Sequence, residues 1–410
     1  MNYVPRVFAT LILAWAGTSL AWAQQPDDEL TNEINFYRGH VFDQVSAHVE
    51  EHFFDPDFNI DEWKRQYAEF RRRAIVAPTR DEFAAIVNEL LATLNASHTH
   101  YFSRLNPKRY QLLGVFHQLY DEDDESLFVY AGIGIDTRGV DGKSFITAAF
   151  DGFPAAQAGL QYGDEIVSVD GAPFHPVLCF AGKADTPVSV VVRRGGEEVT
   201  LEVPVQELDG RTMFERALED STRVIERNGA RIGYLHAWSY AGSKYQEQIR
   251  AALLWGNLSD CDALILDLRD GWGGADLNSV NLFRPAIANI ESATRDGDPQ
   301  NYTGVWGKPV VLLTNGGSTS GKELFTFGFR KLGLGTVVGE KTAGAVVGGR
   351  AFLLTNGDLL YLAVTDVTVD GQRLEGVGVE PDITVPRPVQ GADNLDVQLE
   401  AAIEVLAGGN

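Results

Sequence analysis

Apolar side chains recur at helical spacing through the first part of the chain. Between Asn32 and Leu94 most of them follow one another at three- to five-residue steps, and Pro56 interrupts the pattern. Thr79 stands before Asp81 and Glu82, as the N-cap of a further helix would. The pattern predicts an N-terminal helical region that delivers the chain to the segment 95–101.

The period changes from about Leu127 to Glu207. Short runs rich in β-branched residues are separated by Gly, Asp and Pro turns, which is typical of a small β domain. Pro154 to Leu160 lies between two of these runs and predicts a short helix that ends at a glycine.

Strand and helix patterns alternate in the remainder of the chain. A charged stretch from Arg211 to Arg227 predicts a helical linker. Buried-strand runs follow at 232–235, 263–268, 310–314 and 337–339, with 351–354 expected to add to them. Helices are predicted at 244–255 and from Ser320 onward. This alternation indicates a mostly parallel sheet covered by helices.

The N-terminus resembles an export signal. Arg6 precedes a mostly apolar run, and Ala21-Trp22-Ala23 is a cleavage pattern, so residues 1–23 are expected to be removed. No later run is long enough to cross a bilayer, so no stable membrane anchor is expected in the mature form, which we expect to be periplasmic or secreted. The two cysteines, Cys179 and Cys261, lie in different predicted domains, and their bridging stays open.

The net charge of the chain disfavours some classes of binding partner. The 57 acidic and 34 basic residues give a formal net charge of −23, which repels phosphate backbones and anionic membrane surfaces. Nucleic acid is therefore not an expected partner. Cysteine and histidine are not clustered at metal-ligand spacing, so neither a metal nor another cofactor is expected.

The β-rich segment resembles a PDZ domain. Pro154 to Leu160, Gly163-Asp164-Glu165-Ile166 and Val169-Asp170-Gly171 fill the domain's sequence pattern over some 80 residues. The resemblance implies that Gly132, Ile133, Gly134 and Ile135 form the peptide-binding loop. Glycine there lets backbone N–H groups approach a terminal carboxylate, and an adjacent edge strand can accept an added peptide strand.

The segment from Thr314 to Leu324 is the most informative for chemistry. Its hydroxyl groups stand on a glycine-rich turn between a buried strand and a helix. Such a turn exposes one side chain and offers helix N-terminal N–H groups to an anion, which suits a serine nucleophile. The same pattern also describes an ordinary helix cap.

The whole set of segments resembles the carboxy-terminal processing (tail-specific) peptidases. Asn315 and Glu323 take their places in the nucleophile motif and Ser320 takes the nucleophile's; further matches lie at 94–101, 266–274 and 374–383. The resemblance implies a crotonase/ClpP-like α/β peptidase core with an inserted PDZ domain, a β-rich and partly open barrel. We therefore expect a signal peptide at 1–23, a helical region at 24–125, the PDZ domain at 126–208 and the core at 209–410.

One position departs from the commoner family pattern. Many members use a Ser–Lys dyad, and Ala345 stands where that lysine belongs. Thr342-Ala343-Gly344 instead resembles the tricorn-core branch, which implies Ser320 as nucleophile, His98 as base, and Glu375 and Ser97 as orienting groups. Gly321, Gly273 and Gly274 are expected to donate to the oxyanion.

Other interpretations stay open from sequence alone. His98 could face a helix dipole, His100 is a rival base, and Lys341 or Lys322 could act as a displaced lysine. Glu323 is more typical of a first-turn carboxylate than of a catalyst, and Asp267 and Arg269 are expected to form a structural pair.

The expected activity is endopeptidase cleavage of unstructured or C-terminal polypeptide segments through an acyl-enzyme on Ser320. A catalytically inactive PDZ scaffold that binds peptide ends, or a small-ligand or acyl-transfer enzyme on the same core, are the alternative classes. A homo-oligomer is left open.

Overall fold

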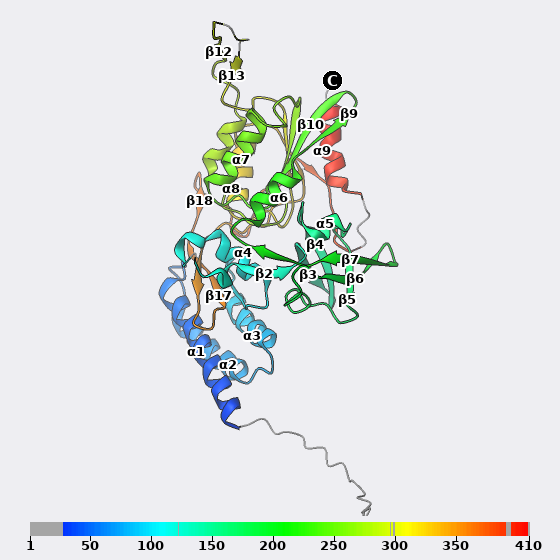
Figure 1. The fold of residues 1–410 in the computed structure, drawn as a ribbon. Coiled ribbons are helices and arrows are strands. Elements are labelled where there is room, and N and C mark those ends of the chain that lie inside the picture. Colours follow the sequence, from blue (N-terminus) through cyan, green and yellow to red (C-terminus); the bar gives the residue numbers. More distant parts are fainter. Residues whose placement is uncertain (1–27, 122, 296, 298–299, 391–394, 409–410) are drawn as a thin grey trace, which may run out of the picture.

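The computed structural model describes residues 28–410, apart from 122, 296, 298–299, 391–394 and 409–410. The expected signal peptide at 1–23 lies outside the described residues. Figure 1 shows three parts along one axis: helices of the N-terminal region at one end, the β-rich middle, and the α/β part at the other end.

Three helices, α1 (Asp28–His52), α2 (Ile60–Ile75) and α3 (Arg80–Ala92), form the N-terminal part. The side chains of Asn59 and Thr79 cap α2 and α3 by accepting from the N–H groups of Glu62 and Glu82. Strand β1 (His100–Phe102) follows α3 and leads to α4 (Pro107–Val115) and two short 3₁₀ turns, η1 (His117–Leu119) and η2 (Glu125–Leu127).

A three-stranded antiparallel sheet joins this N-terminal part to the far end of the chain. Its order is β1, β17 (Leu359–Thr365) and β16 (Gly348–Leu353), and its apolar face packs against the helices. The prediction that 351–354 adds to the large sheet is therefore wrong. A tight turn at 354–358 folds β16 back on β17, and Phe352 is buried among the helices instead.

The middle part is a five-stranded antiparallel sheet in the order β3 (Ile135–Val140), β4 (Lys143–Ala149), β5 (Glu165–Val169), β6 (Pro187–Arg194) and β7 (Glu197–Pro204). Helix α5 (Pro154–Gln157) and a ribbon of β2 (Val129–Gly132) with β8 (Gln206–Asp209) complete it. Strand β3 is an edge of the sheet because within the described chain it pairs with β4 alone.

The C-terminal part contains a six-stranded sheet in the order β20 (Ile383–Thr384), β15 (Thr336–Gly339), β14 (Val310–Thr314), β11 (Ala263–Asp267), β10 (Ala230–His236) and β9 (Arg223–Arg227). All neighbours except β9 and β10 are parallel, as the alternating pattern predicts. Helices α6 (Met213–Ser221), α7 (Ser243–Leu254) and α8 (Gly321–Lys331) contribute to the hydrophobic core on one face, and α9 (Val397–Ala407) covers the other. The remaining elements are η3 (Leu277–Phe283), β12 (Ile290–Ser292), β13 (Gln300–Tyr302), β18 (Thr368–Val369) and β19 (Gln372–Arg373).

The predicted helical linker 211–227 is only half a helix. Helix α6 ends at Ser221, and β9 then forms a hairpin with β10. Asn228 and Gly229 connect the two strands with φ of 54° and 83°. This Asn-Gly pair with two positive φ values is the turn that matches the twist of a hairpin, so tertiary pairing overrides the charged helical pattern.

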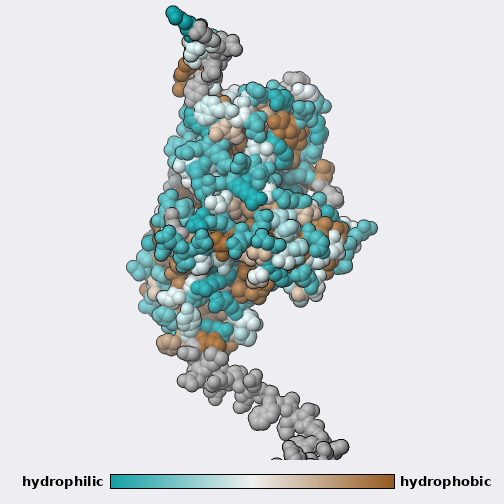
Figure 2. All heavy atoms as spheres, in the orientation of Figure 1, coloured by the Kyte–Doolittle hydropathy of each residue, from teal (hydrophilic) through white to brown (hydrophobic). Residues whose placement is uncertain are grey.

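The surface is mostly polar. On the face shown in Figure 2, hydrophilic residues cover much of the C-terminal part and apolar residues lie in separate patches. Within the described residues, none of the helices has both the length and the apolar content that crossing a membrane requires. Cys179 and Cys261 are both free thiols.

Candidate active site

Ser320 stands on a strained turn between β14 and α8, at the carboxyl end of a parallel strand. Its φ of 57° and ψ of −126° are unusual for a residue with a side chain. The backbone N–H of Ser320 donates to the Ala345 carbonyl (2.8 Å) and to Glu323 Oε1 (3.2 Å), and these two contacts hold the turn. A strained serine at a strand-to-helix turn is a recurrent way to present a nucleophile.

Glu323 is a buried anchor for this turn. Oε1 also accepts from the Ala345 N–H (2.7 Å), while Oε2 accepts from Thr342 Oγ1 (2.6 Å) and the Gly344 N–H (2.7 Å). Burial raises the pKa of the Glu323 carboxyl, against the effect of these donors. Glu323 therefore fixes the segment 342–345 against the serine, which matches its expected role as a first-turn carboxylate.

His98, Ser97 and Glu375 form a hydrogen-bonded series. Ser97 Oγ donates to Glu375 Oε2 (3.0 Å) and lies 3.1 Å from His98 Nδ1. Glu375 is fixed in turn by the N–H groups of Ser97 (2.9 Å), Val346 (2.7 Å) and Val347 (3.1 Å). Since the Ser97 hydroxyl donates its hydrogen bond to the carboxylate, its oxygen can accept one from Nδ1–H of His98. In that tautomer Nε2 of His98 carries no proton and can act as an acceptor.

The local environment sets the charge of this series. Burial lowers the pKa of His98 to about 4, although the neighbouring Glu375 raises it. The pKa of Glu375 is lowered because the donated N–H and O–H bonds outweigh its own desolvation. At neutral pH the series is thus a carboxylate, a hydroxyl and a neutral imidazole. His98 also has a positive φ of 55°, so strain occurs at both candidate residues.

One cavity of about 1020 Å³ brings these segments together. Ser97, His98, Ser320 and Ala345 all line it, and Glu375 lies behind Ser97. Within the described residues no hydrogen bond joins the Ser320 hydroxyl to His98. In serine hydrolases this contact is often long in the absence of substrate. The structure therefore brings nucleophile and base candidates to a shared space from positions that are distant in the sequence.

The three glycines predicted as oxyanion donors border the serine. A Cβ on Gly273 would lie 2.6 Å from Ser320 Cβ, and one on Gly321 would lie 2.3 Å from the Ala275 nitrogen. The N–H groups of Gly273, Gly274 and Gly321 have no acceptor among the described residues. Free N–H groups beside a hydroxyl are the donors that a tetrahedral oxyanion requires.

Neither candidate lysine faces this cavity. Lys341 pairs with Glu380 (3.0 Å) at the surface. Lys322 is fully buried, where its ammonium donates to the carbonyls of Asp270 (2.6 Å) and Trp238 (3.4 Å), and burial lowers its pKa to about 7. His100 does line the cavity, but within the part described it has no carboxylate or hydroxyl partner to orient its ring.

Asp267 and Arg269 form the expected structural pair. Arg269 Nε lies 2.9 Å from Asp267 Oδ1, and both side chains are buried. The guanidinium also donates to Asp396 and Gln398, two residues at the start of α9 that the sequence did not indicate. This network attaches the strand that precedes the glycine loop to the C-terminal helix.

A second, smaller cavity of about 120 Å³ adjoins the predicted peptide-binding loop. Gly132, Ile133, Gly134 and Ile135 all line it, together with the first turn of α4. The free edge of β3 begins at this loop, so a peptide could add to the sheet there.

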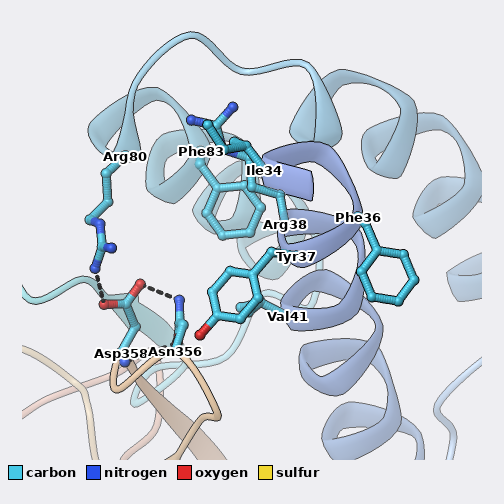
Figure 3. Close-up of a pocket in the computed structure, with 9 residues that line it drawn as sticks. All are labelled: Ile34, Phe36, Tyr37, Arg38, Val41, Arg80, Phe83, Asn356 and Asp358. Atoms are coloured by element: carbon cyan, nitrogen blue, oxygen red, sulfur yellow. Dashed lines mark hydrogen bonds and ion pairs between the residues drawn. The ribbon is translucent and has the colours of Figure 1, made fainter. Parts of the chain in front are cut away.

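A third cavity, of about 490 Å³, lies in the N-terminal part. It is bounded by α1, α3 and the turn before β17 (Figure 3). Its buried acid, Asp358, accepts from Arg80 (3.2 Å) and Asn356 (2.6 Å). Among the described residues that line this cavity there is no serine, cysteine or histidine. The described residues include no group of three His, Cys, Asp or Glu placed to hold a metal ion.

Comparison with known proteins agrees with this architecture. Residues 231–385 match peptidase family S41 and residues 131–205 match the PDZ domain. The chain is 26% identical over 380 residues to a carboxyl-terminal-processing protease of Synechocystis sp., covering 88% of this chain and 85% of that protein. It is 28% identical over 396 residues to a putative tricorn protease homolog 2 of Streptomyces coelicolor, covering 89% of this chain but 32% of the relative.

Solved structures show the same fold. The crystal structure of the tricorn protease superposes with a TM-score of 0.54 at 21% identity, over 92% of this chain and 37% of that one. The photosystem II D1 C-terminal processing protease gives a TM-score of 0.50 at 21% identity, over 90% of this chain and 97% of that one. Ser320 and Glu375 fall within the S41 match, while Ser97 and His98 lie before either matched segment.

Proposed function

Because the chain is a serine-type peptidase with a family S41 domain and a PDZ domain, we propose that it is an exported endopeptidase in which Ser320 is the nucleophile and His98 the general base. The observation that carries this proposal is the double contact of Ser97. Its hydroxyl joins a carboxylate to the imidazole inside the cavity that Ser320 lines.

The proposed reaction begins when His98 Nε2 takes the Ser320 proton and Oγ attacks the peptide carbonyl. The new negative charge on the carbonyl oxygen is stabilised by the free N–H groups of Gly273, Gly274 and Gly321. His98 then donates the proton to the leaving amine, and an acyl-enzyme remains on Ser320. A water molecule activated by His98 releases the product acid.

Glu375 acts through Ser97 in this account. Direct pairing with His98 is replaced by the hydroxyl, which fixes the Nδ1–H tautomer and passes the stabilising effect of the carboxylate to the imidazolium. Ala345 lines the cavity where a Ser–Lys dyad would place its lysine. We therefore assign the base to His98, the cavity histidine whose ring contacts an orienting hydroxyl.

The middle domain is proposed to bind peptide C-termini at Gly132–Ile135. The substrates would be polypeptides with unstructured or C-terminal segments, because an added strand at β3 requires an extended chain. Export is proposed from residues 1–23, with cleavage after Ala23; N-terminal sequencing of the mature protein should then begin at Gln24.

The activity is tested with an internally quenched, unstructured peptide. Ser320→Ala and His98→Ala should abolish cleavage, and Lys341→Met, the matched surface control, should cleave like wild type. No cleavage by the wild type of any unstructured peptide would favour a binding scaffold. Full activity of His98→Ala would refute the assignment of the base.

A further inference from the structure

The cavity beside the peptide-binding loop contains donors that the fold leaves unused. The N–H groups of Ile133 and Gly134 have no acceptor among the described residues. The Tyr130 side chain also lines the cavity, and its buried hydroxyl lies beside Gln111. Buried donors without partners are costly, so this cavity is built to receive an acceptor.

The backbone of the loop is fixed in this arrangement. Gly134 has a φ of 82°, and a Cβ there would lie 2.4 Å from Phe153 Cβ. Its carbonyl accepts from the Phe150 N–H (2.9 Å), and that of Ile133 accepts from the Ala155 N–H (2.9 Å). Because both carbonyls accept hydrogen bonds from the domain itself, the loop backbone is held in one conformation before a ligand binds.

Lys108, a basic residue from outside the PDZ domain, lines the same cavity. It belongs to the first turn of α4, and PDZ similarity begins only at residue 131. In this acidic protein Lys143, Lys183 and Lys244 have carboxylate partners, whereas Lys108 has none among the described residues. Its ammonium lies 5.7 Å from the centroid of the Trp272 ring, which lines the catalytic cavity.

The other walls define the rest of the ligand. Phe174, Phe180 and Leu208 supply an apolar surface for a last side chain. Asp136 is the acid in the wall, and Gln111 donates to it (3.2 Å). Lys108, Asp136 and Thr137 also line the catalytic cavity, so a peptide held here lies at the entrance to that cavity.

We propose that Lys108 is the cation that binds the C-terminal carboxylate of a peptide ligand, completing the PDZ carboxylate site from α4. The ligand is therefore a polypeptide with a free carboxylate and an apolar last residue, and an amidated end binds weakly. This inference rests on the proposed function of the middle domain, because it assigns a residue to that domain's site.

The test compares two fluorescent, unstructured peptides that end in valine, one with a free carboxylate and one amidated. Fluorescence anisotropy gives both dissociation constants on a Ser320→Ala background, so that the peptides remain intact. The protein with Lys108 should bind the free-carboxylate peptide more tightly than the amidated one. Lys108→Met should reduce the ratio of the two dissociation constants about tenfold, the effect of one charge-assisted hydrogen bond. Lys108→Arg should retain the preference, and so should Lys183→Met, a control whose partner is Asp170 outside both cavities.

Each other outcome has a separate meaning. An unchanged preference in Lys108→Met overturns the inference while leaving the PDZ assignment intact. Equal weakening of both peptides also overturns it, because the side chain would then act by shape alone. A lack of preference in the protein with Lys108 refutes the proposed binding of C-termini itself.

Discussion

The bridging hydroxyl of Ser97 gives the sharpest test of the proposed catalytic series. Ser97→Ala removes both the bond to Glu375 Oε2 and the contact with His98 Nδ1. The carboxylate keeps its bonds from the Ser97, Val346 and Val347 N–H groups, so it stays in place. The substitution therefore disconnects the imidazole from the acid and leaves both residues present.

The expected loss follows from these contacts. A hydrogen bond to a charged group contributes roughly 1.5–3 kcal/mol, and an unoriented imidazole adds to this loss in the transition state. About 3 kcal/mol corresponds to roughly a hundredfold fall in kcat/KM. Complete loss of a triad acid costs about 10⁴-fold, which is an upper limit here because the Glu375 charge stays close.

The assay is steady-state hydrolysis of the quenched peptide, with kcat and KM determined separately. The fall should appear in kcat, because Ser97 touches the base and not the substrate. Ser97→Thr keeps a hydroxyl and should recover most of the activity. Thr99→Val is the matched control: it removes a bond to the Ser97 carbonyl (3.0 Å) but leaves the bridge. The reasoning is refuted if Ser97→Ala stays within threefold of wild type in kcat, or if Thr99→Val is equally impaired.

Further predictions concern pH, the buried lysine and two glycines. The folded pKa of His98 is about 4, below its unfolded value near 6.5, so the acid limb of the kcat/KM profile should lie near pH 4 in pH–rate measurements. Because the unfolded chain then binds a proton that the folded chain does not, the free energy of unfolding should fall as pH is lowered from about 6.5 to 4. Lys322→Met should keep peptidase activity, and an inactive but folded variant would revive a lysine base. In the wild type the folded protein releases the Lys322 proton near pH 7, so its free energy of unfolding should rise between pH 7 and 10. The variant should show a smaller rise over the same range. Gly273→Ala should lower kcat at least about a hundredfold, because its Cβ would displace the Thr319 carbonyl at 2.5 Å and the serine itself; near-normal kinetics would remove Gly273 from the oxyanion site. Gly134→Ala should abolish anisotropy-detected binding of C-terminal peptides while hydrolysis of a small ester persists, and retained binding would contradict the loop assignment.

Local pattern was sufficient for most elements, including the glycine-rich turn between β14 and α8. The helical periodicity before Leu94 and the buried runs at 263–268 and 310–314 correspond to α1–α3, β11 and β14. The same turn is compatible with a serine nucleophile or with a helix cap, and the family resemblance selected Ser320 as the nucleophile candidate. Elements formed by near neighbours are the ones that periodicity describes well.

Nonlocal packing explains what periodicity alone missed. Ser97 and Glu375 are 278 residues apart, and only the family resemblance suggested that they meet. Strands β16 and β17 pair with β1 in a separate sheet and not with the large one, which no local pattern encodes. Lys108 has an ordinary sequence environment, and its position between two cavities depends on how α4 packs beside β2 and β8. The Asn228-Gly229 turn, by contrast, was a readable hairpin signal that the charged pattern concealed.

The central claim is that one serine performs the covalent step with a histidine as its base. A fluorophosphonate forms a stable adduct with an activated serine, and peptide mapping by mass spectrometry identifies the residue. The account predicts one adduct, on Ser320, in the wild type and in Lys341→Met, with none in Ser320→Ala and strongly slowed labelling in His98→Ala. An adduct on another serine, or undiminished labelling of His98→Ala, would contradict it.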